Sequence, residues 1–163
     1  MKYILKGGTV VGSSVSCEAD LLIDGEKIAA VGKDLLCEGA QVVDVTGKLL
    51  FPGFIDAHTH FDLDVCNTTT ADDFASGTRS ALRGGTTMVI DFACPNKGET
   101  LGYGLALWHE KADGRSSCDY AFHMTIDDWN EGIRAEIPAM FDAGIPSFKM
   151  YMTYPAMMIG DQD

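Results

Sequence analysis

The hydrophobic pattern of the chain changes character at Pro52-Gly53. Before this point, β-rich apolar runs alternate with short polar turns, as in KYILKGGTVV, ADLLIDGEKIAAVG and AQVVDVTGKLLFPG. Asp24-Gly25 is a typical two-residue hairpin signal, and Thr46-Gly47-Lys48 marks a second turn. The pattern predicts that residues 1–52 form a small all-β domain.

Residues 53–163 show a different pattern, in which apolar strand-like runs alternate with helical periodicity. The apolar runs lie at about 54–58, 86–92, 119–125 and 146–152, and the helical patterns lie at about 72–84, 99–113 and 129–143. This alternation is typical of βαβ units around a parallel sheet. The strands are apolar on both sides, which predicts burial of both faces.

A parallel sheet of this kind either stays open and doubly wound or closes into a barrel. No G-x-G-x-x-G motif and no P-loop follows a strand, so nothing supports the open nucleotide-binding form. A complete (β/α)8 barrel needs about 250 residues. We therefore interpret residues 53–163 as the first half of a barrel, and we expect the chain to be the N-terminal fragment of a longer protein.

Each predicted helix has an apolar face and recognisable end signals. Thr70 and Asp73 have the spacing of a capping box before the first helix, and Gly84-Gly85 ends it. Pro138 is expected to kink the third helix or to divide it. The three apolar faces are expected to consist of Phe74, Ala81 and Leu82; of Leu101, Leu105, Trp108 and Ala112; and of Ile133, Ile137, Met140 and Phe141.

Composition narrows the class of protein. Twenty-four acidic residues against 12 basic ones give a net charge of −12, which disfavours nucleic acid or an anionic membrane as a partner. No segment resembles a signal peptide or approaches the roughly 18 apolar residues of a membrane span. The five cysteines have no C-x-x-C spacing and indicate reduced thiols. These features predict a cytoplasmic protein.

Candidate chemistry begins with the segment GFIDAHTHFD, residues 53–62. Side chains at i and i+2 of a strand share a face, so His58 and His60 should point the same way, together with Asp56. They lie where the first barrel strand reaches its C-terminal end, which is the active-site face of such barrels. Two adjacent imidazoles suit a divalent metal such as zinc, although two polar residues closing a strand would give the same pattern.

Lys149 is the second candidate. In GIPSFKMYMTY, alternation puts Ser147, Lys149 and Tyr151 on one face, and Phe148, Met150 and Met152 on the face toward the helices. A lysine pointing into the barrel is expected to lose its proton, and the neutral amine can then react with carbon dioxide to form a carbamate. The simpler alternative is a lysine that extends its ammonium group into solvent.

Three motifs in order, PGFIDAHTHFD, GGTTMVIDFA and GIPSFKMYMTY, resemble the N-terminal half of the amidohydrolase superfamily, and more narrowly the dihydropyrimidinases and hydantoinases. The resemblance implies a metallo-dependent hydrolase barrel preceded by part of a β-sandwich. It further implies a cytoplasmic homotetramer that opens the ring of dihydropyrimidines or 5-substituted hydantoins, giving N-carbamoyl amino acids.

The resemblance also implies the site residues. His58 and His60 would bind the more buried of two divalent metal ions, taken as zinc, and an N6-carboxylated Lys149 would bridge the two metals. Tyr154 would donate a hydrogen bond to the substrate and its developing oxyanion. The residues expected to form the apolar pocket for the substrate's exocyclic group are Leu63, Val65, Tyr151 and Met158.

The remaining family ligands, two histidines and an aspartate, are expected beyond residue 163. His109 is interpreted as a surface residue and His123 as a hydrogen-bonded core histidine. Allantoinases and dihydroorotases are the nearest alternatives, but dihydroorotases typically carry arginine where this chain has Asp62. A non-catalytic interaction protein of the collapsin-response-mediator type is the alternative from another class.

Overall fold

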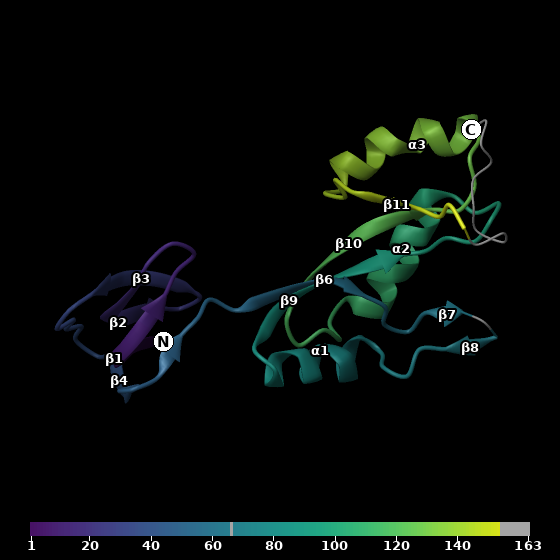
Figure 1. Ribbon diagram of the computed structural model, residues 1–163. Coiled ribbons are helices and arrows are strands. Elements are labelled where there is room, and N and C mark those ends of the chain that lie inside the picture. Colours follow the sequence, from purple (N-terminus) through teal and green to yellow (C-terminus); the bar gives the residue numbers. More distant parts are fainter. Residues whose placement is uncertain (66, 154–163) are drawn as a thin grey trace. The chain divides into compact units, whose positions relative to one another are not determined.

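The computed structural model describes residues 1–65 and 67–153. It divides the chain into two compact units, Met1–Pro52 and Gly53–Asp163, each with its own main sheet (Figure 1). In the described part of the chain, no helix combines the length and the apolar character needed to cross a bilayer.

The first unit is a five-stranded sheet in the order β3-β2-β1-β4, with β5 also pairing with β1. The predicted hairpin is confirmed, because β2 and β3 pair antiparallel with Asp24 opposite Lys27, and Gly25 takes a φ of 62°. Strands β4 and β5 run parallel to β1. The strands are β1 (Lys2–Val11), β2 (Ser16–Asp24), β3 (Lys27–Gly32), β4 (Gln41–Asp44) and β5 (Leu49–Leu50).

A bulge in β1 is held by a buried carboxylate. The register between β1 and β2 shifts between Leu5 and Gly8, and Gly7 has a φ of 80°. Asp20 of β2 accepts hydrogen bonds from the backbone N–H groups of Gly7 at 2.9 Å and Leu35 at 3.1 Å. These hydrogen bonds keep the pKa of Asp20 below its usual value, so the carboxylate is charged when it holds the bulge.

The second unit contains four parallel strands in the order β11-β10-β9-β6. Helices separate consecutive strands, so the unit is the first half of a (β/α)8 barrel, and this prediction is confirmed. The strands are β6 (Phe54–Thr59), β9 (Thr86–Ala93), β10 (Asp119–Ile126) and β11 (Phe148–Met150), and the helices are α1 (Phe74–Arg83), α2 (Leu101–Ala112) and α3 (Glu131–Asp142).

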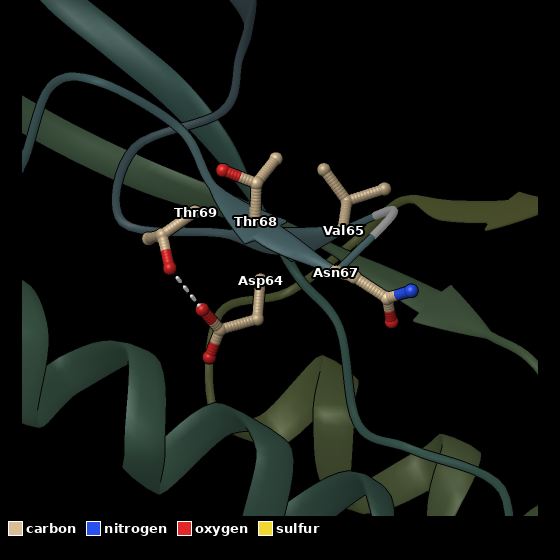
Figure 2. Close-up of a pocket in the computed structure, with 5 residues that line it drawn as sticks. All are labelled: Asp64, Val65, Asn67, Thr68 and Thr69. Atoms are coloured by element: carbon tan, nitrogen blue, oxygen red, sulfur yellow. Dashed lines mark hydrogen bonds between the residues drawn. The ribbon is translucent and has the colours of Figure 1, made fainter.

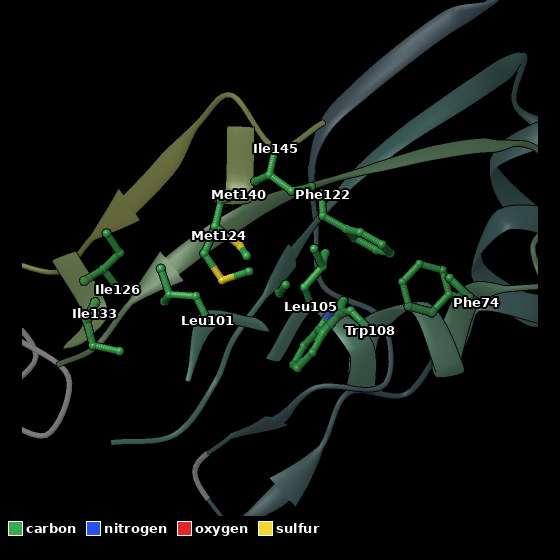
Figure 3. Packing of buried hydrophobic residues seen from close by; sticks show 12 residues of the cluster. Phe74, Leu101, Leu105, Trp108, Phe122, Met124, Ile126, Ile133, Met140 and Ile145 are labelled. Carbon is green, nitrogen blue, oxygen red and sulfur yellow. The ribbon is translucent and has the colours of Figure 1, made fainter. Parts of the chain in front are cut away.

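The core lies between the helices and one face of this sheet (Figure 3). The predicted face of α2 is confirmed, since all four of its apolar residues are buried. They pack with alternate residues of β10, namely Phe122, Met124 and Ile126, and with Phe74 of α1. Because residues 122, 124 and 126 face this core, His123 and Thr125 face the opposite, inner side of the sheet.

The start of α1 differs from the prediction. Asp73 is the N-cap residue and forms a capping box with Ser76, whose backbone N–H donates to Asp73 Oδ1 at 2.7 Å. The predicted Thr70–Asp73 pair is wrong because the helix begins at Phe74 and not near Asp72. Thr70 Oγ1 instead accepts a hydrogen bond from the Leu63 N–H at 3.0 Å.

Several side chains predicted to be buried are exposed. Leu82 is 40% exposed, Phe141 55%, Met150 63% and Met152 85%. Strands β6 and β11 are the edges of the four-stranded sheet, and β6 is exposed along most of its length, so burial on both faces is wrong for these strands. Of the two outcomes expected at Pro138, a kink or a division of the helix, division is wrong, because α3 runs through Pro138 as one helix.

Candidate functional site

His58 and His60 lie at the end of β6 and their rings meet edge to face, with centroids 5.1 Å apart. The strand rule that predicted their common direction therefore gives the right result. Asp56, expected to join them, does something else. Its Oδ1 accepts a hydrogen bond from the His58 backbone N–H at 3.2 Å, within β6 and directly before the histidine pair.

Phe92 of β9 is the centre of the cluster. Its ring centroid lies 4.6 Å from that of His58, 5.0 Å from His60 and 4.8 Å from His123. The Lys149 Nζ lies over the same ring, 4.3 Å from the centroid. Side chains from the three other strands of the sheet thus surround the buried Phe92 ring, and the candidate ligands His58, His60 and Lys149 are brought together.

Lys149 points to the inner side of the sheet, as alternation along its strand predicts. It lies opposite Thr125 of β10 in the parallel register, and its Nζ also lies 4.9 Å from the Tyr151 ring centroid. Phe148 points the other way and packs on Phe141, with ring centroids 5.6 Å apart. The lysine is half-buried, and its Nζ makes cation–π contacts with both rings.

The environment of His60 favours a neutral imidazole. Desolvation lowers its pKa, and the nearby charges of Lys149 and His58 act in the same direction, whereas Asp91 opposes them. The His60 Nδ1 atom is buried and has no hydrogen-bond partner among the described residues. A neutral imidazole with a free, buried nitrogen has the chemistry of a metal ligand, so this pair of histidines fits a divalent cation.

The described residues hold only part of such a centre. In residues 1–65 and 67–153, no group of three His, Cys, Asp or Glu side chains is placed to hold one metal ion. The pair His58 and His60 supplies two nitrogen donors, and Lys149 is not a ligand as a free ammonium. Carboxylation, as predicted from the sequence, would give this lysine oxygen atoms that can bind a metal.

Asp91 supports the histidine pair from the helix side of the sheet, and sequence reasoning missed it. Its Oδ2 accepts hydrogen bonds from Thr59 Oγ1 and from the Phe61 N–H, each at 2.9 Å, on either side of His60. Its Oδ1 accepts from the Trp108 indole at 2.9 Å. Burial raises the pKa of Asp91, and these hydrogen bonds oppose that rise. A single acid inside the apolar run TTMVIDFA was the available signal.

Asp127 is a second carboxyl that sequence reasoning missed. It follows β10 directly, is 8% exposed, and its Oδ1 atom has no hydrogen-bond partner in the described part of the chain. Burial raises the pKa of Asp127 to about 6, and the charges of Lys97 and Lys149 act against that rise.

The loop after His60 carries two of the predicted pocket residues. Leu63 is half-buried and packs against the core, whereas Val65 is 40% exposed in a short hairpin of β7 (Asp64–Val65) and β8 (Thr68–Thr69). That hairpin borders a cavity of about 460 Å³ lined by Asp64, Val65, Asn67, Thr68 and Thr69 (Figure 2). Tyr151 is half-buried beside Lys149, and Tyr154 and Met158 lie outside the described residues.

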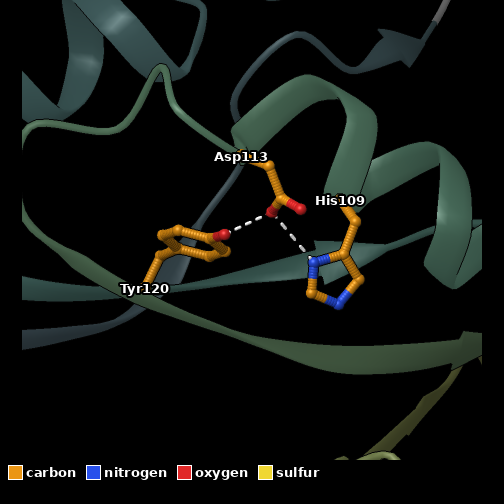
Figure 4. Close-up of polar contacts among 3 residues, drawn as sticks. All are labelled: His109, Asp113 and Tyr120. Carbon is orange, nitrogen blue, oxygen red and sulfur yellow. Dashed lines mark hydrogen bonds and ion pairs between the residues drawn. The ribbon is translucent and has the colours of Figure 1, made fainter.

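His109 lies away from the cluster, in agreement with its interpretation as a surface residue. Its Nδ1 pairs with Asp113 Oδ1 at 3.0 Å, and the Tyr120 hydroxyl donates to the same carboxylate (Figure 4). His123, by contrast, is hydrogen-bonded as predicted but belongs to the cluster around Phe92. Sequence alone did not show this, because the position of β10 beside β9 decides it.

The chain is similar to known proteins over almost all its length. Residues 49–111 match the amidohydrolase family. A D-hydantoinase of Geobacillus stearothermophilus is 44% identical over 99% of this chain and 34% of its own length. The crystal structure of a dihydropyrimidinase from Brevibacillus agri NCHU1002 superposes with a TM-score of 0.96 at 44% identity, covering 99% of this chain and 36% of that one.

The similarity extends to a human dihydropyrimidinase-related protein 5, which is 41% identical over 94% of this chain and 28% of its own length. This chain therefore spans about a third of the length of the relatives it matches. By its motifs, its half-barrel and these similarities, the chain belongs to the amidohydrolase family, in the group of the D-hydantoinases and dihydropyrimidinases.

Proposed function

We propose that the full-length protein is a metal-dependent cyclic amidohydrolase that acts on dihydropyrimidines or 5-substituted hydantoins. The observation that carries the proposal is the convergence of His58, His60 and Lys149 on the Phe92 ring, from the first and fourth strands of the half-barrel. The product would be an N-carbamoyl amino acid, formed when water cleaves the ring amide bond. The protein would be cytoplasmic and homotetrameric, as the resemblance implies.

His58, His60 and a carboxylated Lys149 would hold two divalent metal ions, with zinc as the expected metal. Carboxylation requires the neutral amine of Lys149 to add to the carbon of carbon dioxide, with loss of one proton. Ions held there would lower the pKa of a water molecule to near 7 and polarise the carbonyl of the substrate. The neutral state of His60, which its surroundings favour, leaves its lone pair available for such a metal.

The protein's own side chains would bind and orient the ring. Tyr154 would donate a hydrogen bond to the oxygen on which negative charge develops, because a fixed donor at that position stabilises the transition state. Leu63, Val65, Tyr151 and Met158 would surround the exocyclic group of the substrate. Phe92 would exclude water from beneath the histidine pair, since its ring is only 6% exposed.

Asp62 bears on the choice between related substrates. It stands where dihydroorotases carry arginine, which argues against an acidic substrate. The backbone gives a second reason for aspartate at this position, because residue 62 has a φ of 50°. Its carbonyl accepts a hydrogen bond from Lys111 Nζ at 2.5 Å. Aspartate tolerates this left-handed conformation better than arginine does. Asp62 argues against acidic substrates only, so allantoin stays an alternative substrate in the test.

A non-catalytic interaction protein is the second candidate, and the similarity to dihydropyrimidinase-related protein 5 favours testing it. Metal analysis of the full-length protein, combined with ring-opening assays on dihydrouracil, a bulky 5-substituted hydantoin, dihydroorotate and allantoin, separates the candidates. We expect about two zinc ions per chain and activity on one or both of the first two compounds. Full-length protein that holds no metal and opens none of the four rings would refute the proposal.

A further inference from the structure

The strand that carries the histidine pair contains a bulge at the candidate site. Asp56 pairs with Val89 and Thr59 pairs with Asp91, so two residues of β6, Ala57 and His58, stand opposite the single residue Ile90 of β9. A bulge of this type bends its strand and redirects the side chains around it. The direction of His58 is therefore set by what holds the bulge in place.

The His123 side chain holds this bulge through a hydrogen bond. This side chain extends from β10 across the inner face of β9, and its Nε2 lies 3.1 Å from the carbonyl oxygen of Ala57. A carbonyl oxygen can only accept, so Nε2 carries a hydrogen, and Nδ1 is the acceptor in the tautomer that has its single N–H at Nε2. The bulged carbonyl directly before His58 is thus hydrogen-bonded by a side chain two strands away.

The other nitrogen of His123 reaches Ser147, directly before the neighbouring strand β11. Nδ1 lies 2.5 Å from Ser147 Oγ, and in this tautomer the serine hydroxyl donates to it. Ser147 is two residues before Lys149, and its carbonyl accepts a hydrogen bond from the Met124 N–H at 3.0 Å. One imidazole therefore connects the backbone beside His58 to the segment that leads into Lys149.

The ring of His123 is also fixed by packing. It lies tilted on Phe92, the ring that contacts both His58 and Lys149. Rotation of His123 about its side-chain bonds would break two hydrogen bonds and a ring contact together. Its orientation, and with it the separation between the first and fourth strands at this level, is therefore well defined.

We propose that His123 is a positioning residue that fixes the distance and direction of the His58–His60 pair relative to Lys149. The inference rests on the proposed function and adds a residue that touches neither metal nor substrate. Groups that orient metal ligands usually change metal affinity by about 10- to 100-fold when removed, so an effect of that size is expected here.

Three variants separate the contributions of the two hydrogen bonds and the ring contact of His123. His123→Gln places its amide nitrogen near Nε2 and can still donate to Ala57, whereas His123→Asn places a polar atom near Nδ1 and can still accept from Ser147. His123→Phe keeps the ring contact with Phe92 and loses both hydrogen bonds. Ser147→Ala removes one hydrogen bond without altering the histidine, and it serves as the milder variant if a ring replacement impairs folding.

The measurements are zinc affinity of the metal-free full-length protein, by competition with a coloured chelator, and the visible spectrum of the cobalt-substituted protein. Circular dichroism establishes that each variant is folded. We expect zinc affinity at least tenfold weaker in His123→Phe and His123→Asn, with an altered cobalt spectrum, and largely restored affinity in His123→Gln. We expect Ser147→Ala to lower the carboxylated fraction of Lys149, measured by ¹³C NMR with labelled bicarbonate.

Each result is decisive. Folded His123→Phe and Ser147→Ala proteins with the zinc affinity, cobalt spectrum and lysine carboxylation of the unaltered protein would overturn the inference while leaving the proposed function intact. An unaltered protein that binds no zinc would overturn the proposed function, and with it this inference.

Discussion

Asp91 of β9 and Trp108 of α2 meet in the core, where the indole Nε1 donates a hydrogen bond of 2.9 Å to the carboxylate. The same carboxylate accepts from Thr59, Phe61 and its neighbour Phe92. A buried carboxylate is costly unless its oxygens are hydrogen-bonded, and here both are. The helix is thereby connected to the segment that carries His60, so the stability of the core and the geometry of the site depend on one another.

Removing the indole donor tests this connection. Trp108→Phe should lower the free energy of unfolding of the full-length protein by about 2–3 kcal/mol, because a buried carboxylate loses one of its donors and the smaller ring leaves a gap. Urea denaturation measures the change. Trp129→Phe is the matched control, since Trp129 is half-buried and its indole donates no hydrogen bond to the described residues. Equal losses in the two variants would contradict the role of the Asp91–Trp108 hydrogen bond.

Two helical glycines should respond to alanine with opposite signs. At Gly77 of α1, a Cβ atom would stand 2.2 Å from the Phe61 ring, whereas at Gly102 of α2 the nearest neighbour would be a Glu136 oxygen at 3.9 Å. Gly77→Ala should therefore destabilise the protein by about 1–3 kcal/mol and displace the segment beside His60. Gly102→Ala should stabilise it by about 0.5–1 kcal/mol through helix propensity.

Thermal or urea unfolding of the two glycine variants gives the comparison. A Gly77→Ala protein as stable as Gly102→Ala would mean that Phe61 moves away at no cost, and the packing of Phe61 on α1 would then not be a constraint on the site.

The Tyr120–Asp113 pair predicts a pH dependence away from the site. The hydrogen bond to Asp113, helped by desolvation, raises the pKa of Tyr120 from 10.0 to about 12. Because the folded-state pKa is the higher one, the stabilising contribution is complete below pH 10 and is lost as the pH rises through about 12. The absorbance of tyrosinate, measured as the difference from Tyr120→Phe, should show this late titration.

Asp113→Ala should move that titration of Tyr120 down toward pH 10, because the acceptor that favours the protonated phenol is gone. Glu110→Ala removes a like charge from α2 and should leave the midpoint near 12. A midpoint near 10 in the unaltered protein would contradict the Tyr120–Asp113 hydrogen bond.

Lys149→Ala in the full-length protein should abolish ring opening, since the proposed bridging ligand is removed. Short carboxylic acids added with zinc should restore part of the activity by occupying the space of the missing carbamate. Lys97→Ala, which removes a lysine that acts electrostatically on Asp127 as Lys149 does, is the control and should keep most of the activity. Full activity of Lys149→Ala would exclude the carboxylated lysine.

The sequence predicted the parts of the fold that have strong periodicity. The face of α2 was correct in all four positions because its neighbours, β9, β10 and α3, cover it. The faces of α1 and α3 were correct only in part, because Leu82 and Phe141 lie in the last turns of their helices and stay 40% and 55% exposed, Phe141 despite its contact with Phe148. The β7–β8 hairpin was missed because strands of two residues show no alternation.

The candidate site was predicted strand by strand, and its assembly was not. His58, His60 and Lys149 could be found because alternation along the strands β6 and β11 sets the direction of each side chain. Phe92, Asp91 and His123 could not, since their roles depend on the register of β9 and β10, which pairs Phe122 with Asp91 and His123 with Phe92. Periodicity within one strand carries no information about that register.

The hydrogen bond between His123 and the Ala57 carbonyl also has a consequence for folding order. It joins positions 66 residues apart, with β9 and α2 in the intervening chain. Closing so long a loop costs entropy that the pairing of the intervening strands can offset, so we expect this contact to form after β6, β9 and β10 have paired. On this expectation the imidazole bridge completes late in folding, and a chain stopped before that point would have its secondary structure without a preorganised place for a ligand.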